Sequence, residues 1–552
     1  MIKKLRLIPV SGIGAAALAV AAFSPQGKTE KPNIVLILAD DMGYSDIGCF
    51  GSEIHTPNLD RLASQGLRMT HFYNASRSCP TRASLLTGLY QHQAGVGDMV
   101  NNLGFPAYQG YLNDKCVTLA EVLKLNGYNT FMSGKWHVGS LPEVHPMKRG
   151  FERFFGLIEG AGSYFKPIAY REGMQPVRWM LDDKLFFPPD TGFYFTDAVG
   201  DYSVEFLKGR KEANKPFFLY MAFTAPHWPL HALPEDIAKY RGKYMNGWDA
   251  LRRERFERMK KLGIIDENVK LSPRDERVPE WETLTEEQKK MWDLRMAVYA
   301  AMIDRMDRNI GKLIKYLETT GELNNTLILF LSDNGGCHES TRNQAQFLRV
   351  KGETGTPDSF DAYEYPWANA SNTPFRMYKH WVHEGGIATP FIAYCPKLVK
   401  PGRIDTSPAH IIDIMPTIVE LTGANYPGKI VDLADVKNRE IIKEMDIVPM
   451  EGISLVPVFK GKNLKRKAPF FWEHEGNRAV RDGDWKLVSA YDNNAKKFQK
   501  WELYNLKNDR SELNDLSGKF PEKTTEMISE YEKWAQRVGV VSREIIDRKT
   551  KK

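Results

Sequence analysis

Four short polar clusters in the sequence carry side chains that could bind a metal ion or take part in catalysis. Each cluster directly follows an apolar run that predicts a buried strand. The clusters read "ADD", "KWH", "APH" and "DNGG", and they contain Asp40, Asp41, Lys135, His137, His227, Asp333 and Asn334. In parallel α/β sheets, ligands bind in the crevice outside the carboxyl ends of the strands. The four clusters therefore predict one site at a single edge of a sheet.

The elements that must position these clusters alternate along the chain. Strands are predicted at 33–39, 129–134, 216–224, 326–332 and 389–395, with amphipathic helices between them at 118–127 and 296–321. This alternation is typical of an α/β protein with a largely parallel sheet. At 552 residues the chain is also long enough for two domains.

Each cluster also has a simpler structural explanation. Paired aspartates after a strand often cap the next helix or form a turn. "DNGG" is a good turn sequence, and "KWH" alone is common where surface residues flank a core tryptophan. Because four such clusters coincide at one predicted sheet edge, function is favoured over these explanations.

The acidic members form an all-oxygen set, Asp40, Asp41, Asp333 and Asn334. Hard cations such as Ca²⁺ or Mg²⁺ prefer this set, whereas Zn²⁺ usually recruits histidine or cysteine. Three carboxylates could share a small site only with a cation to neutralise them. A metal bound there would polarise an anionic substrate.

A second set of side chains is basic and consists of Arg82, Lys135, His137, His227 and Lys379. Cationic groups around a metal ion imply an anionic ligand between them. Phosphate and sulfate esters are the substrates that fit this description.

The stretch "SCPTRASLLTG", residues 78–88, could supply a nucleophile. It predicts a short helix with Ser78 as N-cap, Pro80 in the first turn and Gly88 at the end. A residue at a helix N-terminus beside Arg82 lies in a positive field that suits oxyanions. These residues alone leave open whether Ser78, Cys79 or neither is reactive.

The first 25 residues predict a secretory signal peptide, because basic residues precede an apolar run at 7–23 that ends in small residues. A membrane anchor is the alternative, but the run is short and is interrupted by proline and glycine. An exported protein without a stable membrane span after cleavage is therefore expected.

The charge and the cysteines exclude several classes of function. The net charge is +7, and removal of the three basic residues in 1–25 lowers it to +4, since that segment contains no acid. So small a surplus argues against nucleic acid as the main partner. The five cysteines are scattered, and neither a disulfide scaffold nor a zinc site is indicated.

Together these motifs resemble the sulfatase family. The family signature is a cysteine or serine, any residue, proline, a small residue and arginine, followed by a segment that ends in Thr-Gly, and here it runs from Ser78 to Gly88. The register places the family's reactive position at Ser78 and its unrestricted position at Cys79. The resemblance extends from "PNIVLILADDMGYSDIGCFG" through "SGKWHVG", "LSDNGG" and "HEGGIATPFI" to "RAVRDGDWKLV".

The resemblance implies an alkaline-phosphatase-like fold: a mixed, mostly parallel sheet flanked by helices, then a smaller α+β domain with a short antiparallel sheet. The implied catalytic domain spans 30–430, with a helix-rich insertion at 229–295, and the C-terminal domain spans 431–552. The charge runs of the insertion are expected to form a solvated face.

The resemblance also implies the chemistry, in which Ser78 is oxidised to formylglycine and its hydrate attacks sulfur. Arg82 would hold this side chain, Lys135 and Lys379 would bind sulfate oxygens, His227 would act as general acid, and His137 would take a proton from the remaining hydroxyl. The implied cation is Ca²⁺, with Mg²⁺ as second choice, held by Asp40, Asp41, residue 78, Asp333 and Asn334.

Serine at the reactive position resembles bacterial enzymes that depend on a serine-type maturase, which implies an exported, periplasmic protein. The expected substrate is a sulfated glycan, with aryl sulfates as artificial substrates. His474, Asn477 and Arg478 are candidate sugar contacts, although a buried strand entry with polar edges explains them equally well. The alternatives are a non-catalytic glycan-binding protein, if Ser78 stays unmodified, and a phosphodiesterase or phosphonate hydrolase.

Overall fold

The structure is a computed structural model, and it describes residues 30–171, 173–341, 352–431 and 444–550. The predicted signal peptide at 1–25 lies outside the described residues. Within the described ranges, every helix is too short or too polar to cross a membrane.

An eleven-stranded mixed sheet forms the centre of the fold. β1 (Asn33–Ala39) lies between β7 (Phe217–Ala222) and β8 (Thr326–Ser332), and β3 (Asn129–Lys135) adjoins β7, all of them parallel. The interiors of β1, β7 and β8 are continuous apolar runs because both faces of the sheet are buried. β9 (Ala388–Tyr394) is also buried, but it runs antiparallel to its neighbours β8 and β2 (Leu67–Tyr73). The predicted strands and the mixed, mostly parallel sheet are confirmed.

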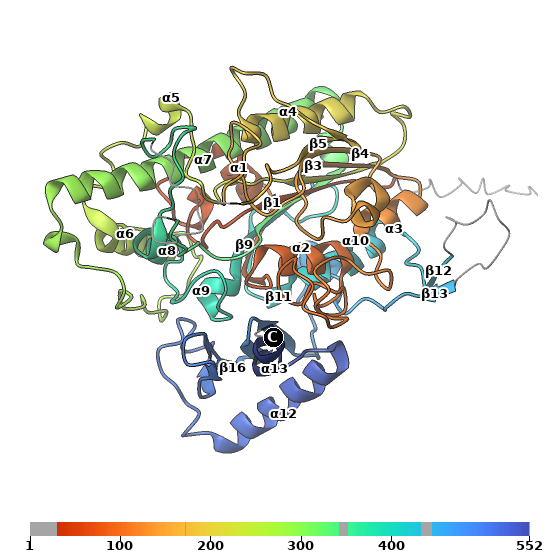
Figure 1. The fold of residues 1–552 in the computed structure, drawn as a ribbon. Helices are drawn as coiled ribbons and strands as arrows, with labels where there is room; N and C mark the ends of the chain where they lie inside the picture. The colour runs from red at the N-terminus through yellow and green to blue at the C-terminus, as the bar shows by residue number, and fades with distance from the viewer. Residues whose placement is uncertain (1–29, 172, 342–351, 432–443, 551–552) are drawn as a thin grey trace, which may run out of the picture. The chain divides into compact units, whose positions relative to one another are not determined.

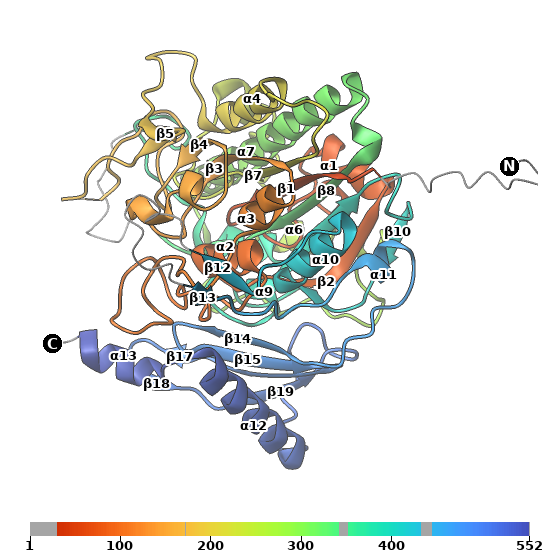
Figure 2. The same cartoon turned by 90° about the vertical axis from the view of Figure 1, so that its right-hand side faces the viewer.

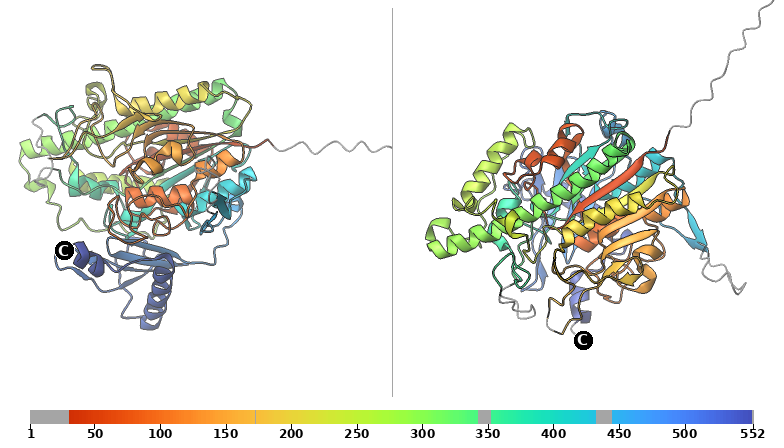
Figure 3. Two further views of the ribbon diagram at one scale, coloured as in Figure 1. Left: turned by 45° about the vertical axis from the view of Figure 1, so that its right-hand side comes forward. Right: turned by 90° about the horizontal axis from the view of Figure 1, so that it is seen from above.

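Helices cover both faces of this sheet (Figures 1 and 2). Val35 and Ile37 of β1 belong to the core on the side of α4 (Phe195–Lys208) and α7 (Glu286–Thr319). Leu36 and its alternate neighbours belong to the core on the side of α2 (Ser78–Thr87), α3 (Leu119–Leu125) and α10 (Ile414–Thr422). Figure 3 shows α7, in green, running beside α4, in yellow, and the two helices are in contact.

Two helix boundaries differ from the sequence prediction. α7 begins ten residues before the predicted 296, because Thr285 and Gln288 form a capping box at its start. In α2 the cap residue is Arg77, and Ser78 is the first helical residue, so the predicted N-cap role of Ser78 is wrong. The Ser78 hydroxyl instead bonds carboxylates from other elements. The predicted end of α2 at Gly88, in the left-handed conformation, is confirmed.

The insertion is helical, but its charges are only partly solvated. α6 (Gly247–Lys261) carries the run of arginines and lysines, and Arg255 within it is fully buried. Its guanidinium donates to Asp46 at 2.5 Å and to Glu53 at 2.9 Å. The predicted solvated face is therefore wrong for this residue, since a buried arginine is tolerated where carboxylates pair with it.

A four-stranded antiparallel sheet follows near the C-terminus, as predicted (Figure 2). Its strands in spatial order are β14 (Phe470–His474), β15 (Asn477–Asp482), β16 (Trp485–Ser489) and β19 (Glu502–Asn505), and α12 (Pro521–Val538) packs on β15 and β16. The predicted domain limits of 30–430 and 431–552 stay predictions.

A buried ion cluster joins this sheet to the segment that precedes β9. Lys486 of β16 lies 3.0 Å from Glu384, at the start of α9 (Glu384–Ile387), and 2.8 Å from Glu512. All three side chains are fully buried. Because Lys379 precedes α9 by five residues, the cluster fixes the C-terminal end of the segment that carries Lys379.

Replacing Lys486 with methionine should lower the free energy of unfolding by about 3–5 kcal/mol, because two buried carboxylates lose their shared cation. Denaturant unfolding monitored by tryptophan fluorescence measures this. Lys500→Met is the control, since the Lys500 side chain is 74% exposed in its ion pair with Asp515, and it should change stability by less than about 1 kcal/mol. Equal effects of the two variants would contradict a structural role of the cluster.

Candidate active site

The polar clusters that follow β1, β3, β7 and β8 lie at one edge of the central sheet, as predicted. The spatial order of these strands is β8-β1-β7-β3, and all four are parallel, so their carboxyl ends are adjacent. Every predicted catalytic or metal-binding side chain is at least nine-tenths buried: Asp40, Asp41, Ser78, Arg82, Lys135, His137, His227, Asp333, Asn334 and Lys379.

Ser78 lies in the first turn of α2 and faces this edge. Its Oγ donates to Asp333 Oδ2 at 2.6 Å and lies 3.2 Å from Asp40 Oδ1. Arg82, one turn further along α2, donates to Ser78 Oγ from Nε at 3.2 Å and to Asp333 Oδ2 from Nη2 at 2.9 Å. The signature helix therefore brings its serine and its arginine to the same carboxylate.

Lys135, at the end of β3, contacts both Asp40 of the acidic set and Arg82 of α2. Its Nζ donates to Asp40 Oδ2 at 2.6 Å, and its carbonyl oxygen accepts a bond from Arg82 at 2.8 Å. Burial, together with the neighbouring Asp333, raises the pKa of Asp40 well above its usual range. The buried carboxylates of Asp40 and Asp333 thus repel each other, and a further cation would relieve this repulsion.

Asp41 and Asn334 form the other side of the cluster. Asn334 Nδ2 donates to Asp41 Oδ1 at 2.7 Å, and Lys379 Nζ donates to Asp41 Oδ2 at 2.9 Å. Burial opposes ionisation of Asp41, but His227 and Lys379 outweigh it and lower the pKa of the carboxyl. Asp41 adopts a left-handed backbone conformation with φ 65°, which is unusual outside glycine and is common at functional sites.

The donors at this edge fit a hard divalent cation. Asn334 Oδ1 is fully buried and has no hydrogen-bond partner among the described residues, and a buried acceptor of this kind costs free energy unless it binds something. Asp40, Asp41 and His227 each offer one donor atom within 4.8 Å of the others. The described residues therefore provide a possible acidic metal site, rich in the oxygen ligands that Ca²⁺ and Mg²⁺ prefer.

The two predicted catalytic histidines are held in different ways. His227 donates from Nδ1 to the Trp228 carbonyl at 2.6 Å, so its Nε2 is left facing Lys379 Nζ at 3.4 Å. Burial lowers the pKa of His227 to about 3, with Asp41 opposing and Lys379 adding to the shift. His137 has a left-handed backbone, φ 55°, and within the part of the chain that the structure describes its buried Nδ1 has no hydrogen-bond partner.

A pocket of about 100 Å³ opens over this cluster. Ser78 and Lys379 line it together with both histidines, Tyr170 and Trp228. The pocket is thus small, and cationic, hydrogen-bonding and aromatic side chains line it.

Comparison with known proteins identifies the family to which the chain belongs. The profile of the sulfatase family, described as Sulfatase, matches residues 32–424. The chain belongs to the sulfatase family. A second profile, N-sulphoglucosamine sulphohydrolase, C-terminal, matches residues 375–537 of the sulfatase.

Individual relatives agree with this assignment. The sulfatase is 38% identical to an uncharacterized sulfatase of Schizosaccharomyces pombe, over 94% of this chain and 96% of that protein. It is 38% identical to an arylsulfatase of Klebsiella aerogenes, over 82% of this chain and 97% of that protein. Among solved structures, Ps i-CgsB in complex with k-i-k-neocarrahexaose matches with 28% identity and a TM-score of 0.64, over 92% of this chain and 93% of that one. The protein is an enzyme that hydrolyses sulfate esters.

Sequence reasoning missed several residues of the pocket, among them Arg77, Tyr170 and Glu339. Glu339 accepts from Trp228 Nε1 at 2.9 Å and pairs with Arg77 at 2.9 Å and with Lys379 at 3.4 Å. It lies six residues after Asp333 in "DNGGCHE", and Arg77 directly precedes the signature. Proximity to these motifs was the signal that could have found Glu339 and Arg77, whereas no motif lies next to Tyr170.

The three candidate sugar contacts do not line the pocket of Ser78. His474 and Asn477 are fully buried at the β14–β15 turn, and Asn477 Nδ2 contacts His380 Nε2 at 3.0 Å. Arg478 lies between Phe498 and Trp501, at 4.0 Å and 4.3 Å from the ring centroids. Direct contact of these residues with substrate stays a prediction.

Replacing Gly160 with alanine should lower kcat by up to about 100-fold, because a small displacement of a catalytic group is costly. A Cβ at this position would lie 2.4 Å from His137 Nε2, and Gly160 also lines the pocket. Steady-state kinetics on 4-nitrophenyl sulfate measures the loss. Gly518→Ala is the control, since its Cβ would meet no atom within 4 Å. An unchanged kcat in Gly160→Ala would show that displacing the His137 side chain does not affect catalysis.

Proposed function

We propose that this sulfatase removes sulfate from sulfated carbohydrates, with formylglycine derived from Ser78 and a bound Ca²⁺. The observation that carries the proposal is the position of Ser78. Its Oγ lies between Asp333, Asp40 and Arg82, in a pocket that Lys379 and both histidines also line. Ser78 thus contacts the acidic cluster and also lines the pocket that would bind the substrate.

The formylglycine hydrate, when present, supplies the nucleophilic oxygen at position 78. Arg82 would hold this side chain through Nε, which already contacts Ser78 Oγ at 3.2 Å. An unmodified serine hydroxyl is a weak nucleophile without an adjacent base. In this structure its nearest partners are two carboxylates and a guanidinium, and neither histidine bonds it.

The carboxylates Asp40, Asp41 and Asp333, with Asn334 and residue 78, would hold Ca²⁺, which when bound polarises the sulfate ester. The unpartnered Asn334 Oδ1 supports this assignment. Lys135 and Lys379, which pair with Asp40 and Asp41 in this structure, would bind sulfate oxygens. The basic residues would thereby fix the orientation of the ester.

His227 would donate a proton from Nε2 to the leaving oxygen. The bond from Nδ1 to the Trp228 carbonyl fixes the ring so that Nε2 is the nitrogen free for this task. A sulfate ester beside Nε2 brings negative charge, which favours the protonated ring and offsets the burial that lowers its pKa. His137, on the same pocket, would accept a proton from the residue 78 side chain.

A sulfated glycan is the substrate class that we propose, with aryl sulfates as artificial substrates. The relative with 28% identity was solved with a neocarrahexaose, an oligosaccharide, over 92% of this chain. The small pocket would take the sulfate group, and Trp228 and Tyr170, which also line it, would lie near the sugar that carries the sulfate.

We further propose export through residues 1–25 to a bacterial periplasm and maturation by a serine-type formylglycine-generating enzyme.

The proposal is tested by a desulfation screen over sulfated monosaccharides that differ in ring position, with matured enzyme and Ca²⁺. Release of sulfate from at least one sugar supports it. Cleavage of 4-nitrophenyl sulfate but of no sulfated sugar would reject the carbohydrate substrate. Faster hydrolysis of 4-nitrophenyl phosphate than of the sulfate would favour a phosphoesterase, and no turnover of any ester would favour a non-catalytic glycan-binding protein.

Calcium should raise the melting temperature of the wild-type protein and not that of Asp41→Asn. A ligand at a hundredfold excess over its Kd stabilises the folded state by about 2.7 kcal/mol. Differential scanning fluorimetry after chelation and re-addition of metal measures this. Asp201→Asn, a change in a carboxylate that is 62% exposed, should keep the calcium response. A larger response to Mg²⁺ would contradict the choice of Ca²⁺, and no response to either would contradict the metal site.

A further inference from the structure

Glu339 is an acidic residue in the pocket proposed for a sulfate ester. Among the described residues that line the pocket of Ser78 it is the one acid, whereas three are cationic: Arg77, Arg171 and Lys379. A carboxylate repels an anionic ester, so attraction of the sulfate group does not explain why this residue lies here. Its contacts give the explanation.

Both carboxylate oxygens of Glu339 have partners. Oε1 pairs with Arg77 Nη2 at 2.9 Å. Oε2 accepts from Trp228 Nε1 at 2.9 Å and lies 3.4 Å from Lys379 Nζ. Burial opposes ionisation of Glu339, but Lys379 and Arg77 outweigh it and hold the pKa of the carboxyl well below its usual range. Glu339 is thus a bonded carboxylate whose charge the neighbouring cations balance.

The topology of the sheet brings Glu339 and Trp228 together. β7 and β8 both run parallel to β1, one on each side of it, so the loops that follow them leave the sheet at the same edge. Trp228 lies on the loop after β7, and Glu339 lies on the loop after β8. Their hydrogen bond therefore joins two loops that flank the acidic residues after β1.

The two partners of Glu339 Oε2 contact opposite nitrogens of the His227 ring. The Trp228 carbonyl accepts from His227 Nδ1 at 2.6 Å, and Lys379 Nζ lies 3.4 Å from His227 Nε2. The rings of His227 and Trp228 also pack together, with centroids 4.5 Å apart. One carboxylate oxygen thus links the residue that orients His227 to the residue that faces its Nε2.

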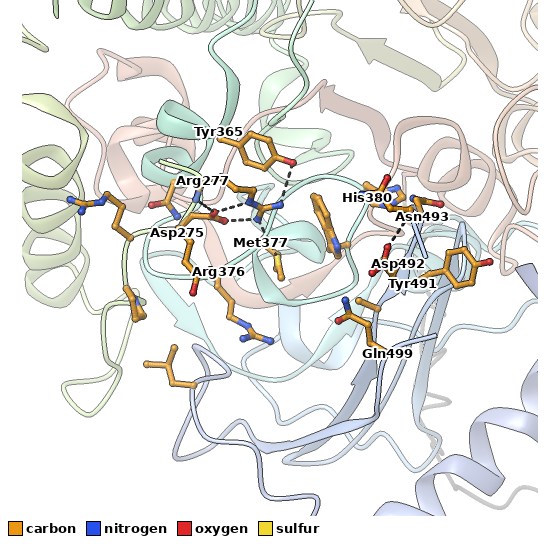
Figure 4. Close-up of a pocket in the computed structure, with 18 residues that line it drawn as sticks. Asp275, Arg277, Tyr365, Arg376, Met377, His380, Tyr491, Asp492, Asn493 and Gln499 are labelled. Carbon is orange, nitrogen blue, oxygen red and sulfur yellow. Dashed lines mark hydrogen bonds and ion pairs between the residues drawn. The ribbon is translucent and has the colours of Figure 1, made fainter. Parts of the chain in front are cut away.

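The loop after β8 also supports the backbone of Lys379. Residues 376–377 and 380–381 line a separate groove of about 810 Å³ (Figure 4), whereas Lys379 lines the catalytic pocket. The Lys379 backbone N–H donates to the Gly336 carbonyl at 3.2 Å. Gly336 and Glu339 therefore hold Lys379 through its backbone and its side chain.

We propose that Glu339 is a positioning residue for the hydrolysis of sulfate esters. It bonds Trp228 and Lys379 through one oxygen and thereby fixes His227 between them, while Arg77 balances its charge. Glu339 acts through these neighbours rather than on the reacting atoms. This inference rests on the role of general acid proposed for His227.

The test compares phenyl sulfate with 4-nitrophenyl sulfate on matured enzyme with Ca²⁺, and so it needs no sugar substrate. Phenol has a pKa of about 10, as tyrosine does, so phenolate is a poorer leaving group than nitrophenolate and depends more on a general acid. Glu339→Ala should lower kcat about tenfold more on phenyl sulfate than on 4-nitrophenyl sulfate, because His227 is displaced.

Glu339→Gln separates the hydrogen bond from the charge. The glutamine side chain keeps a carbonyl oxygen for Trp228 Nε1 but has no negative charge for Arg77. The ratio of the two kcat values should therefore stay within about twofold of the wild-type ratio. Recovery of the ratio by glutamine is a result that a merely structural ion pair would not give.

Trp228→Phe removes the indole N–H that Glu339 accepts and should reproduce the selective loss on phenyl sulfate. In the double variant with Glu339→Ala the two losses should not add, because both changes break the same contact. Glu322→Ala is the matched control. Glu322 is 21% exposed against 20% for Glu339, pairs with Arg210 at 2.8 Å and lies outside the pocket. This control should leave both kcat values within about twofold of wild type.

Equal losses on the two esters in Glu339→Ala, beside a selective loss in His227→Ala, would overturn this inference alone. An unchanged kcat in Glu339→Ala, or full additivity with Trp228→Phe, would overturn it as well. Equal losses on the two esters in His227→Ala would overturn the general-acid role and the inference together, so the two failures are distinguishable.

Discussion

Replacing Ser78 with alanine should lower kcat on 4-nitrophenyl sulfate by at least about 10⁴-fold, because the precursor of the nucleophile is removed. The change also removes the hydroxyl that lies 2.6 Å from Asp333, so calcium affinity should fall together with activity. Steady-state kinetics and calcium titration by calorimetry measure the two effects on one preparation.

Cys79→Ala is the matched control for this variant. Cys79 is the next residue of α2, it is fully buried, and its Sγ contacts the Asp98 carbonyl at 3.7 Å and Met99 Sδ at 3.6 Å. Burial also raises the pKa of this thiol to about 12, so it is not a nucleophile at neutral pH. A Cys79 variant as inactive as Ser78→Ala, in a folded protein, would transfer the reactive role to the cysteine.

Replacing His227 with alanine should lower kcat by about 10²–10⁴-fold on a sugar sulfate and by much less on 4-nitrophenyl sulfate. A sugar alkoxide is a poor leaving group and needs a proton in the transition state, whereas nitrophenolate leaves without one. The ratio of the two losses, rather than either loss alone, identifies a general acid.

Two observations would contradict this role. Equal losses on both substrates would make His227 a binding residue, which its contacts with Lys379 at 3.4 Å and Asp41 at 3.4 Å would also permit. A similar ratio in His55→Ala would show that the effect is unspecific, since His55 is exposed and lies outside the pocket.

The strands and the edge of the sheet could be predicted from the sequence because their physical signal is local. β1 and β8 match the predicted 33–39 and 326–332, since strands buried on both faces are apolar without interruption. The polar residues after them are equally local, and parallel strands bring their carboxyl ends to one edge. The acidic set and three of the basic residues, Lys135, His137 and His227, could therefore be predicted from their positions at the ends of strands.

Contacts between residues far apart in the sequence could not be predicted from such local patterns. Lys379 meets Asp41 across 338 residues of sequence, and it follows none of the predicted strands, so the sequence could not show which carboxylate it would contact. Arg255 was expected to be solvated because α6 is charged, but its partners Asp46 and Glu53 lie 209 and 202 residues earlier in the sequence. A helix pattern cannot show which of its charges a distant carboxylate will bury.

Predictions from local sequence also failed at residues whose side chains contact partners on other elements of the site. Ser78 has the type and position of an N-cap, yet its hydroxyl bonds Asp333 and Asp40 and leaves the helix start without a side-chain cap. Glu339 stands in no motif, although it contacts Arg77, Trp228 and Lys379. Such residues become visible only when the fold places their partners around them.

Mass spectrometry of the peptide that contains residue 78, from protein produced with a serine-type maturase, tests the central claim most directly. We expect this peptide to lack two hydrogens relative to encoded serine and to react with a hydrazide, and we expect the modified fraction to scale with sulfatase activity across preparations. An unmodified serine in a fully active preparation would contradict the formylglycine mechanism.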